Sequence, residues 1–233
     1  MQFPPYKRKE DLSYALGFYP TIELLETHRE NVLALLVSSR IRPDTLSDLK
    51  QRAPGIPIVQ NDKPIKRLTD KENCYVAGVF HKYPTTLEKD RNHVILYQPQ
   101  DMGNLGTIMR TIHAFGIPNL CIISPGADAF HPKTIRASMG SVFSLNVESI
   151  ESIARYTETH TNTLYCFDAK GKLKLRDTTF LAPYSLVFGN EAAGIPQEEI
   201  STHTTVSIPQ LGNVDSINIA VSVGIGLYEA TNV

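Results

Sequence analysis

The fold is decided by three stretches of this sequence: Asn104-Leu-Gly-Thr-Ile-Met-Arg110, Leu186-Val-Phe-Gly-Asn-Glu191 and Ile208-Pro-Gln-Leu-Gly-Asn-Val-Asp-Ser-Ile-Asn218. Each follows an apolar, β-branched run, and two of them open an apolar segment with helical spacing. Open α/β sheets bind their ligands beyond the carboxyl ends of their strands. The three stretches therefore predict a ligand site of glycine-bearing turns and polar side chains at one end of a sheet.

The pattern around these stretches, from residue 93 onward, is strand then helix, repeated. Strands that alternate with helices of about 10–15 residues predict a mostly parallel sheet with helices on both faces. We expect strands over residues 93–98, 120–124, 163–168, 185–188 and 204–208, and helices over 105–115, 132–140, 149–159 and 216–231.

The first part of the chain has its own pattern of short elements. It predicts a helix over residues 14–25, a buried strand over 32–38 and a short helix over 44–52, then strand, short helix and strand over 56–80. The polar stretch 82–92 contains Pro84 and two threonines, which favour a linker. We therefore predict a small α/β domain over residues 1–85, a linker over 86–92 and a larger domain over 93–233.

The composition of the 233 residues is that of a globular protein, with 42% hydrophobic and 20% charged residues. No apolar run approaches the ~20 residues of a membrane span, and the first residues lack an apolar signal-peptide core. Cys74, Cys121 and Cys166 are far apart without metal-ligand spacing, which indicates reduced thiols in a cytoplasmic protein with no metal site. The net charge of −1 argues against a long basic surface, so a nucleic acid would have to meet a local basic patch.

The first stretch predicts one outward-facing arginine near the start of a helix. Asn104 is expected to cap this helix, and Gly106 leaves room for a ligand or for backbone. Arg110 lies off the apolar stripe, so it projects toward whatever lies beyond the strand ends. A solvated surface arginine is the commoner role for such a residue. His113 lies one turn after Arg110. We expect it to be a partly buried histidine with a backbone partner rather than a residue that orients Arg110.

The second and third stretches predict tight turns that expose backbone groups. Gly189 ends a buried strand, and Glu191 is a candidate partner for a ribose, a cationic sulfonium or another chain's arginine. Later, Gly212 permits a reversal, and Ser216 or Asp215 is expected to cap the closing helix. An ordinary turn and an ordinary capped helix are the simpler interpretations. The spacing also predicts a core-facing stripe of Ile217, Val221, Ile225 and Tyr228.

Taken in this order, the three stretches resemble the signature motifs of the SPOUT superfamily of S-adenosylmethionine-dependent RNA methyltransferases, in particular its TrmH-like 2′-O-ribose branch. The family's Asn-x-Gly-x-x-x-Arg pattern is matched at Asn104, Gly106 and Arg110. The first stretch is preceded by Asp101-Met-Gly, where the family usually has a proline, and Ala192 replaces a glycine of the second motif. The third motif is matched at Ile208, Pro209, Gly212, Ser216 and Asn218.

The resemblance implies an α/β fold with a C-terminal trefoil knot, and a homodimer that builds each site from two chains. It also implies methyl transfer from S-adenosylmethionine to a ribose 2′-hydroxyl of tRNA or rRNA, without a metal. Arg110 would be the catalytic residue, better suited to orientation and charge stabilisation than to accepting a proton. Asn104, Glu191, Ser216 and Asn218 would complete the catalytic site. The cofactor would be held by Phe188, Gly189, Asn190, Ile208, Gln210, Leu211, Ser216 and Asn218.

The expected RNA contacts are basic residues in two places. Residues 1–85 are similar in pattern to the small RNA-binding domain that precedes the catalytic domain in several TrmH-like enzymes. A further matching patch covers residues 132–140. Ordinary surface charge is an alternative for all of these residues. The candidates are Arg40, Arg42, Lys63, Lys66 and Arg67 in the first domain, and Lys133 and Arg136 in the patch.

Two other functions are weighed against methyl transfer. A knotted RNA-binding protein with little or no turnover would keep the fold, but the intact Asn104, Arg110 and Glu191 count against it. A nucleotide-binding oxidoreductase would need a Gly-x-Gly-x-x-Gly turn after the first strand, with an acidic residue about 20 positions later. The sequence has no such turn there, which makes this third hypothesis poor.

Overall fold

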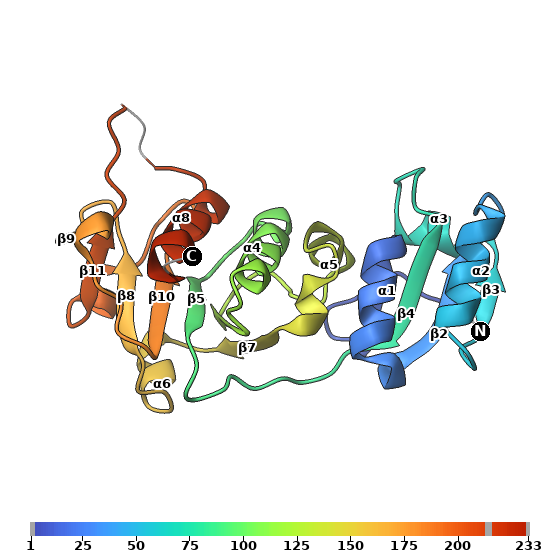
Figure 1. The fold of residues 1–233 in the computed structure, drawn as a ribbon, viewed down its shortest axis with the longest axis horizontal. Coiled ribbons are helices and arrows are strands. Elements are labelled where there is room, and N and C mark those ends of the chain that lie inside the picture. The colour runs from blue at the N-terminus through green and yellow to red at the C-terminus, as the bar shows by residue number, and fades with distance from the viewer. Residues whose placement is uncertain (1–2, 213–215, 232–233) are drawn as a thin grey trace. The chain divides into compact units, whose positions relative to one another are not determined.

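The computed structural model describes residues 3–212 and 216–231, and the chain divides into two compact units. The N-terminal unit is Met1–Pro84 with Asp128–Ser144, and the C-terminal unit is Thr85–Ala127 with Leu145–Val233. Each unit has its own sheet (Figure 1). Among the helices that the structure describes, none combines the length and the apolar content that crossing a membrane requires.

The N-terminal unit is built on a four-stranded sheet of order β1-β4-β2-β3. Strand β4 (Val76–His81) is antiparallel to β1 (Leu12–Leu16) and to β2 (Val32–Val37), whereas β3 (Ile58–Gln60) is parallel to β2. Successive residues of β2 belong to two different apolar clusters, Leu35 to one and Leu36 to the other, because alternate side chains point to opposite faces. The helices are α1 (Phe18–Thr27), α2 (Pro43–Arg52), α3 (Asp62–Leu68) and α5 (Pro132–Ala137), with 3-10 turns at Arg29–Asn31 and Ser141–Ser144.

The helix predicted over residues 14–25 is wrong in its first part. Residues Leu12–Leu16 form strand β1, and helix α1 begins only at Phe18. Gly17, with φ of 110°, joins the two elements in a conformation that other residues rarely adopt. The misassignment arose because β1 is nearly all buried, and a short apolar run without alternation does not distinguish a strand from a helix.

The C-terminal unit is built on a seven-stranded sheet of order β7-β6-β5-β10-β8-β11-β9. Every neighbouring pair is parallel, which confirms the predicted sheet type. The central strands carry fully buried apolar residues, as expected for a parallel sheet covered on both faces. The strands are β5 (His93–Tyr97), β6 (Asn119–Ile123), β7 (Asn146–Ile150), β8 (Thr163–Phe167), β9 (Leu173–Lys174), β10 (Tyr184–Phe188) and β11 (Thr204–Ser207).

Two of the predicted helices of this unit, over residues 149–159 and 216–231, are shorter than expected, whereas the helix expected over 105–115 begins three residues earlier, at Met102. Residues 149–159 do not form one helix, because β7 extends to Ile150 and α6 (Ile153–Thr157) begins only after Ser152. Ser152 caps α6, since its side chain accepts a hydrogen bond from Arg155 N. The edge strand β9 was missed, since two residues carry no periodic signal. Helix α4 (Met102–Ala114) packs against α8 (Ile219–Thr231) (Figure 1). A one-turn helix α7 (Gln197–Ile200) and a 3-10 turn at Leu175–Asp177 complete the unit.

Helix α8 faces the sheet with a different side from the one predicted. Val221, Ile225 and Tyr228 are 52%, 37% and 60% exposed, so this stripe points away from the core. The buried side includes Gly226, where a Cβ would lie 2.8 Å from Phe167 Cζ and 3.0 Å from Phe188 Cζ. Because the helix is apolar on all sides, spacing alone could not identify the buried face; the glycine that allows close approach does.

Candidate active site

A cavity of about 450 Å³ lies at the carboxyl ends of β8, β10 and β11 and the start of α8. Parallel strands end on one side of a sheet, so all three predicted stretches contribute to it. Leu211 does not line the cavity, and its side chain is fully exposed. The predicted residues that do line it are Asn104, Phe188, Gly189, Asn190, Glu191, Ile208, Gln210, Ser216 and Asn218.

The second stretch forms a tight loop that Asn190 holds together. Its side-chain oxygen accepts from Ala192 N at 2.9 Å and Ala193 N at 3.1 Å, and its amide donates to Gln98 O at 2.8 Å. The backbone of Asn190 pairs in both directions with Gly194, and a Cβ on Gly189 would lie 2.6 Å from Gly194 C. Only glycine fits at Gly189, and the side chain of Asn190 serves to shape the loop.

A chain of side-chain hydrogen bonds joins the three stretches at the cavity. Asn218 Nδ2 donates to Asn104 Oδ1 at 3.1 Å, and Asn104 Nδ2 donates to Glu191 Oε1 at 3.4 Å. Glu191 also accepts from Gln100 N at 3.3 Å and Asp101 N at 3.4 Å, so its carboxylate is oriented toward the loop before α4. Residues that are 114 positions apart in the sequence are thereby held in a single polar cluster.

Both predicted helix caps were misplaced. Helix α4 is capped by Asp101, whose Oδ1 accepts from Asn104 N at 2.7 Å, because the helix begins at Met102 rather than Leu105. Helix α8 begins at Ile219, and Asn218 Oδ1 accepts from Ala220 N at 2.8 Å in place of Ser216. The other predicted cap, Asp215, lies outside the described residues. Because Asp101 caps α4, the side chain of Asn104 is available for the polar cluster. Asn218 caps α8 with its Oδ1 and contributes its Nδ2 to the same cluster.

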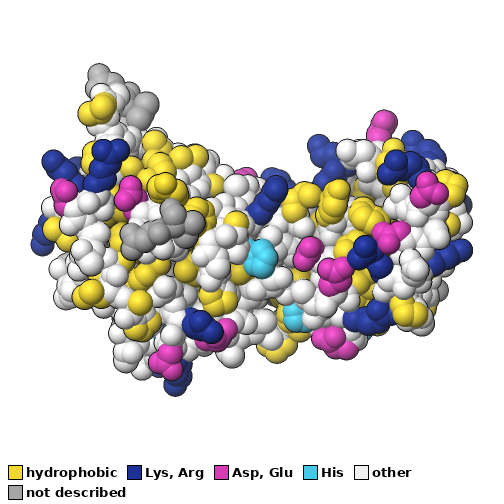
Figure 2. Space-filling model, in the orientation of Figure 1, with side chains coloured by type: hydrophobic (Ala, Val, Ile, Leu, Met, Phe, Trp, Pro, Cys, Tyr) yellow, Lys and Arg dark blue, Asp and Glu magenta, His cyan; other side chains and the backbone are white. Residues whose placement is uncertain are grey.

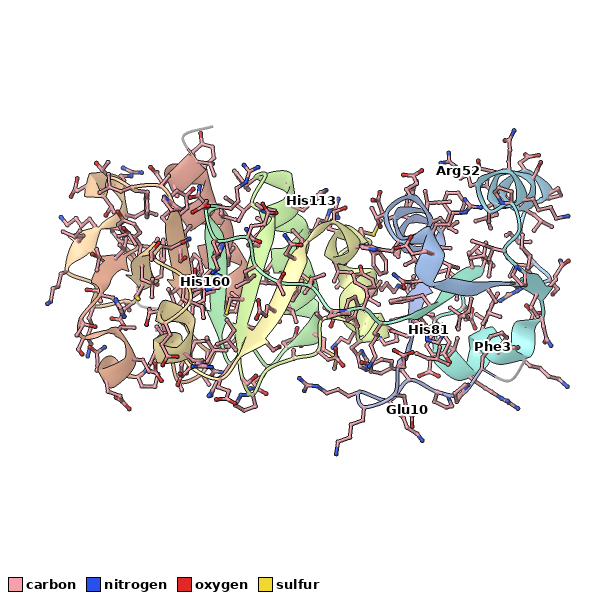
Figure 3. All side chains as sticks on the ribbon, turned by 90° about the horizontal axis from the view of Figure 1, so that it is seen from below. Phe3, Glu10, Arg52, His81, His113 and His160 are labelled. Atoms are coloured by element: carbon pink, nitrogen blue, oxygen red, sulfur yellow. The ribbon has the colours of Figure 1, made fainter. Side chains whose placement is uncertain are left out.

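Arg110 does not line the cavity of its own chain. It is exposed on α4, and no hydrogen bond or ion pair joins it to another described residue. Arg110 is six residues after Asn104, which in a helix corresponds to a rise of ~9 Å along the axis and a rotation of ~120° around it. His113, predicted to be partly buried, is exposed on the same helix (Figure 3). The cluster of Asn104, Glu191 and Asn218 therefore lacks the arginine predicted to complete it.

The charged residues among the described residues that line the cavity are all acidic. Asp168 and Glu191 lie among its walls, and none of its described lining residues is Lys, Arg or His. The apolar wall includes Phe167 and Phe188, whose rings stack with centroids 4.3 Å apart. Phe167, Asp168 and Ala169 were missed from the sequence, because only the strand order places the end of β8 beside β10. The cavity thus suits a ligand with an apolar part and a positive charge.

Cysteine chemistry is absent from this site. Cys74, Cys121 and Cys166 are buried and free, and none of them lines the cavity. Burial raises the pKa of the Cys166 thiol to about 12, so it stays protonated at neutral pH. A second cavity, about 400 Å³ and lined mainly by threonines and histidines at the amino ends of β8 and β11, contains none of the predicted residues.

The seven predicted RNA contacts all lie in the N-terminal unit. Asp62 ties the loop that carries Arg40 and Arg42 to helix α3, because its carboxylate accepts from Ser38 and Ser39. These hydrogen bonds lower the pKa of Asp62 to about 2. The remaining candidates are exposed Lys63, Lys66 and Arg67 on α3, and Lys133 and the half-buried Arg136 on α5.

The fold and the three joined stretches define a SPOUT-type α/β protein with a ligand cavity at its strand ends. A family model described as the SpoU rRNA Methylase family matches residues 91–228, and the chain belongs to this family. An uncharacterized tRNA/rRNA methyltransferase of Synechocystis is 36% identical over 142 residues, which cover 59% of this chain and 52% of that protein. The chain therefore spans about half the length of this relative.

Two further relatives cover most of the chain. A 23S rRNA (uridine(2479)-2′-O)-methyltransferase of Streptomyces viridochromogenes is 30% identical over 89% of this chain and 69% of its own length. The crystal structure of an AdoMet-bound rRNA methyltransferase from Sinorhizobium meliloti superposes with a TM-score of 0.82 at 28% identity, covering 95% of this chain and 87% of the other. The N-terminal unit as well as the C-terminal one therefore has a counterpart in these proteins.

Proposed function

We propose that this protein transfers a methyl group from S-adenosylmethionine to a ribose 2′-hydroxyl of rRNA or tRNA. The observation that carries the proposal is the hydrogen-bonded chain from Asn218 through Asn104 to Glu191 at the cavity. It unites the three stretches that resemble the family's motifs, in a chain that belongs to a methylase family. The named Streptomyces relative acts on the 2′-oxygen of an rRNA nucleotide, which supports the same reaction here.

The residues of the cavity fit S-adenosylmethionine. When bound, this cofactor supplies a methyl group on a positively charged sulfur. The stacked pair of Phe167 and Phe188 offers an apolar wall for an adenine ring, and the carboxylates of Asp168 and Glu191 favour the cationic end. We assign the cofactor contacts to Phe188, Gly189, Asn190, Ile208, Gln210, Ser216 and Asn218, with Leu211 limited to its backbone.

The position of Arg110 supports a site shared by two chains. Arg110 is exposed and does not line the cavity of its own chain, and the apolar stripe of Val221, Ile225 and Tyr228 on the adjacent helix α8 is exposed as well. We propose that two copies pair through α8, and that Arg110 of each copy lies beside the ribose in the other copy's site. There its guanidinium orients the 2′-hydroxyl and stabilises the developing negative charge.

The N-terminal unit supplies the first contacts with RNA in this proposal. Its exposed basic residues on α3 and in the loop 38–42 are held together by Asp62, and phosphate contacts of this kind position an RNA without reading its sequence. The division into a substrate-binding and a catalytic domain follows from this assignment. An RNA substrate and three reduced thiols both fit a cytoplasmic enzyme.

The test is incubation of the purified protein with tritiated S-adenosylmethionine and total RNA, followed by nucleoside mass spectrometry. We expect a 2′-O-methylated nucleoside that disappears with Arg110→Ala. Arg155→Ala is the matched control, because it removes another exposed arginine of the same unit. Cofactor binding without label transfer by the wild type would reject the enzyme in favour of an RNA-binding protein. Full activity of Arg110→Ala would reject the role of Arg110.

A further inference from the structure

Half of the basic residues of the C-terminal unit lie in one stretch of seven residues. This unit carries eight Lys or Arg against 13 Asp or Glu, and four of the eight lie in Lys170-Gly-Lys-Leu-Lys-Leu-Arg176. We call this stretch the basic edge, because it contains β9, the last strand of the seven-stranded sheet. Figure 2 shows Lys and Arg side chains gathered where β9 and β11 lie in Figure 1.

The charges of the basic edge are free to meet a partner. All four side chains are exposed, and no ion pair joins any of them to another described residue. By contrast, Arg91 and Arg155 of the same unit pair with Glu88 and Glu158. The acidic residues that flank the stretch are Asp168 and Asp177, and Asp168 Oδ1 is engaged by the backbone N–H of Lys170 at 2.7 Å. The stretch therefore concentrates positive charge in a unit that is otherwise acidic.

The backbone of the basic edge is well anchored, so its side chains project from a defined position. Leu173 and Lys174 pair in parallel with Val206 and Ser207 of β11, and Lys172 N donates to Thr205 Oγ1 at 3.1 Å. Leu175 is buried and holds the following turn against the unit. Lys172 and Lys174 flank Leu173 in extended backbone, and alternate residues of such a chain are ~6.6 Å apart. This spacing is of the order of the distance between successive phosphates of an extended strand.

The basic edge begins at the cavity. Asp168 and Ala169 line the cavity wall, and Lys170 is the next residue. Val206, which pairs with Leu173, is also a lining residue. We propose that the basic edge binds the phosphates of a single-stranded segment of the substrate RNA beside the target nucleotide. This proposal rests on the proposed function. Binding at the basic edge would hold the RNA strand that carries the target ribose next to the cofactor cavity, in addition to the contacts that the N-terminal unit makes with RNA.

The test compares two double variants of the full chain that lose the same charge. Lys172→Gln with Lys174→Gln alters the basic edge, and Lys89→Gln with Arg155→Gln is the matched control. Binding of a fluorescein-labelled oligouridylate is followed by anisotropy between 0.05 and 0.5 M salt, about the range in which phosphate contacts dominate. Two lost contacts to single-stranded RNA lower the salt slope of log K by about 1.4, which is roughly a tenfold loss of affinity near 0.15 M salt.

The outcomes are distinct. A tenfold loss with a smaller salt slope in the basic-edge variant alone, with cofactor affinity unchanged, supports the proposal. Equal losses in both double variants, or no loss in either, overturn it. In methylation assays the basic-edge variant is expected to raise the KM for RNA and leave kcat unchanged. A wild type that transfers no methyl group would contradict the proposed function, yet the anisotropy result would still decide the role of the basic edge.

Discussion

Replacing Gly226 tests how α8 packs over the cavity wall. In Gly226→Ala the new Cβ would lie 2.8 Å and 3.0 Å from the ring tips of Phe167 and Phe188. The two rings are buried and stacked, so they cannot rotate away. Overpacking of this kind costs about 1–3 kcal/mol, and the better helix propensity of alanine offsets about 1 kcal/mol of it. We expect a net loss of about 1 kcal/mol in the free energy of unfolding.

Gly224→Ala on the same helix is the control. Its Cβ would meet nothing closer than Thr111 Cγ2 at 3.8 Å, an ordinary contact, so alanine should stabilise the helix by about 1 kcal/mol. The two variants should thus differ by about 2 kcal/mol, or roughly 4–8 °C in Tm for a chain of this size. Urea titration and thermal melts measure the difference, and calorimetry should show weaker S-adenosylmethionine binding for Gly226→Ala alone. A Gly226→Ala variant as stable as Gly224→Ala would refute the packing argument.

Three further predictions concern the polar cluster, a buried histidine and the exposed stripe. Asn218→Ala should reduce methyl transfer and lower stability by about 1 kcal/mol, because it removes the cap of α8 and the bond to Asn104; Asn218→Ser should recover the stability without the activity. His93 is buried as the neutral form, with its pKa lowered mainly by desolvation, so the wild type should lose stability as the pH falls below about 6.5. Ile225→Ser with Tyr228→Ser should yield monomers in sedimentation velocity, because it makes the exposed stripe of α8 polar.

The controls for these predictions differ. For Asn218, equal activity of the serine variant and the wild type would remove the amide from the proposed site. For His93, a lowered folded pKa gives stability that is present above the unfolded pKa and lost below it, so His93→Gln should flatten the loss between pH 7 and 5. The exposed His113→Gln should leave that loss unchanged. For the exposed stripe of α8, a wild-type protein that sediments as a monomer would contradict the proposal that two copies pair through this helix.

The sequence predicted the sheet type and most of the cavity because these depend on local signals. Glycines in tight turns and polar residues after apolar runs indicated the three stretches, and the family resemblance selected Gly189, Asn190, Glu191 and Asn218 within them; all four line the cavity. Strand order is not local, so the neighbouring end of β8, with Phe167 and Asp168, was missed. The knot stays a prediction from resemblance.

Side-chain direction on an apolar helix was the other failure. Val221, Ile225 and Tyr228 were expected to be buried, but α8 is apolar on every side, and its facing is decided by Gly226 against two phenylalanine rings. The same limit applies to β1, where a run without alternation looked like a helix. Charge gave a weak signal too, because an overall balance near zero hid the basic edge inside an acidic unit.

The order of the seven strands has a consequence for synthesis. The interior strand β5 finds its neighbour β6 within 26 residues, since His93 is opposite Asn119. Its other edge pairs with β10, where Val94 is opposite Leu186, 92 residues later in the chain. At about 5–20 residues per second, a ribosome needs roughly 5–20 s to make that partner. During this time the backbone N–H and C=O groups on that edge of β5 have no strand partner, and its apolar side chains are uncovered, so the nascent chain is open to wrong strand pairing until β10 emerges.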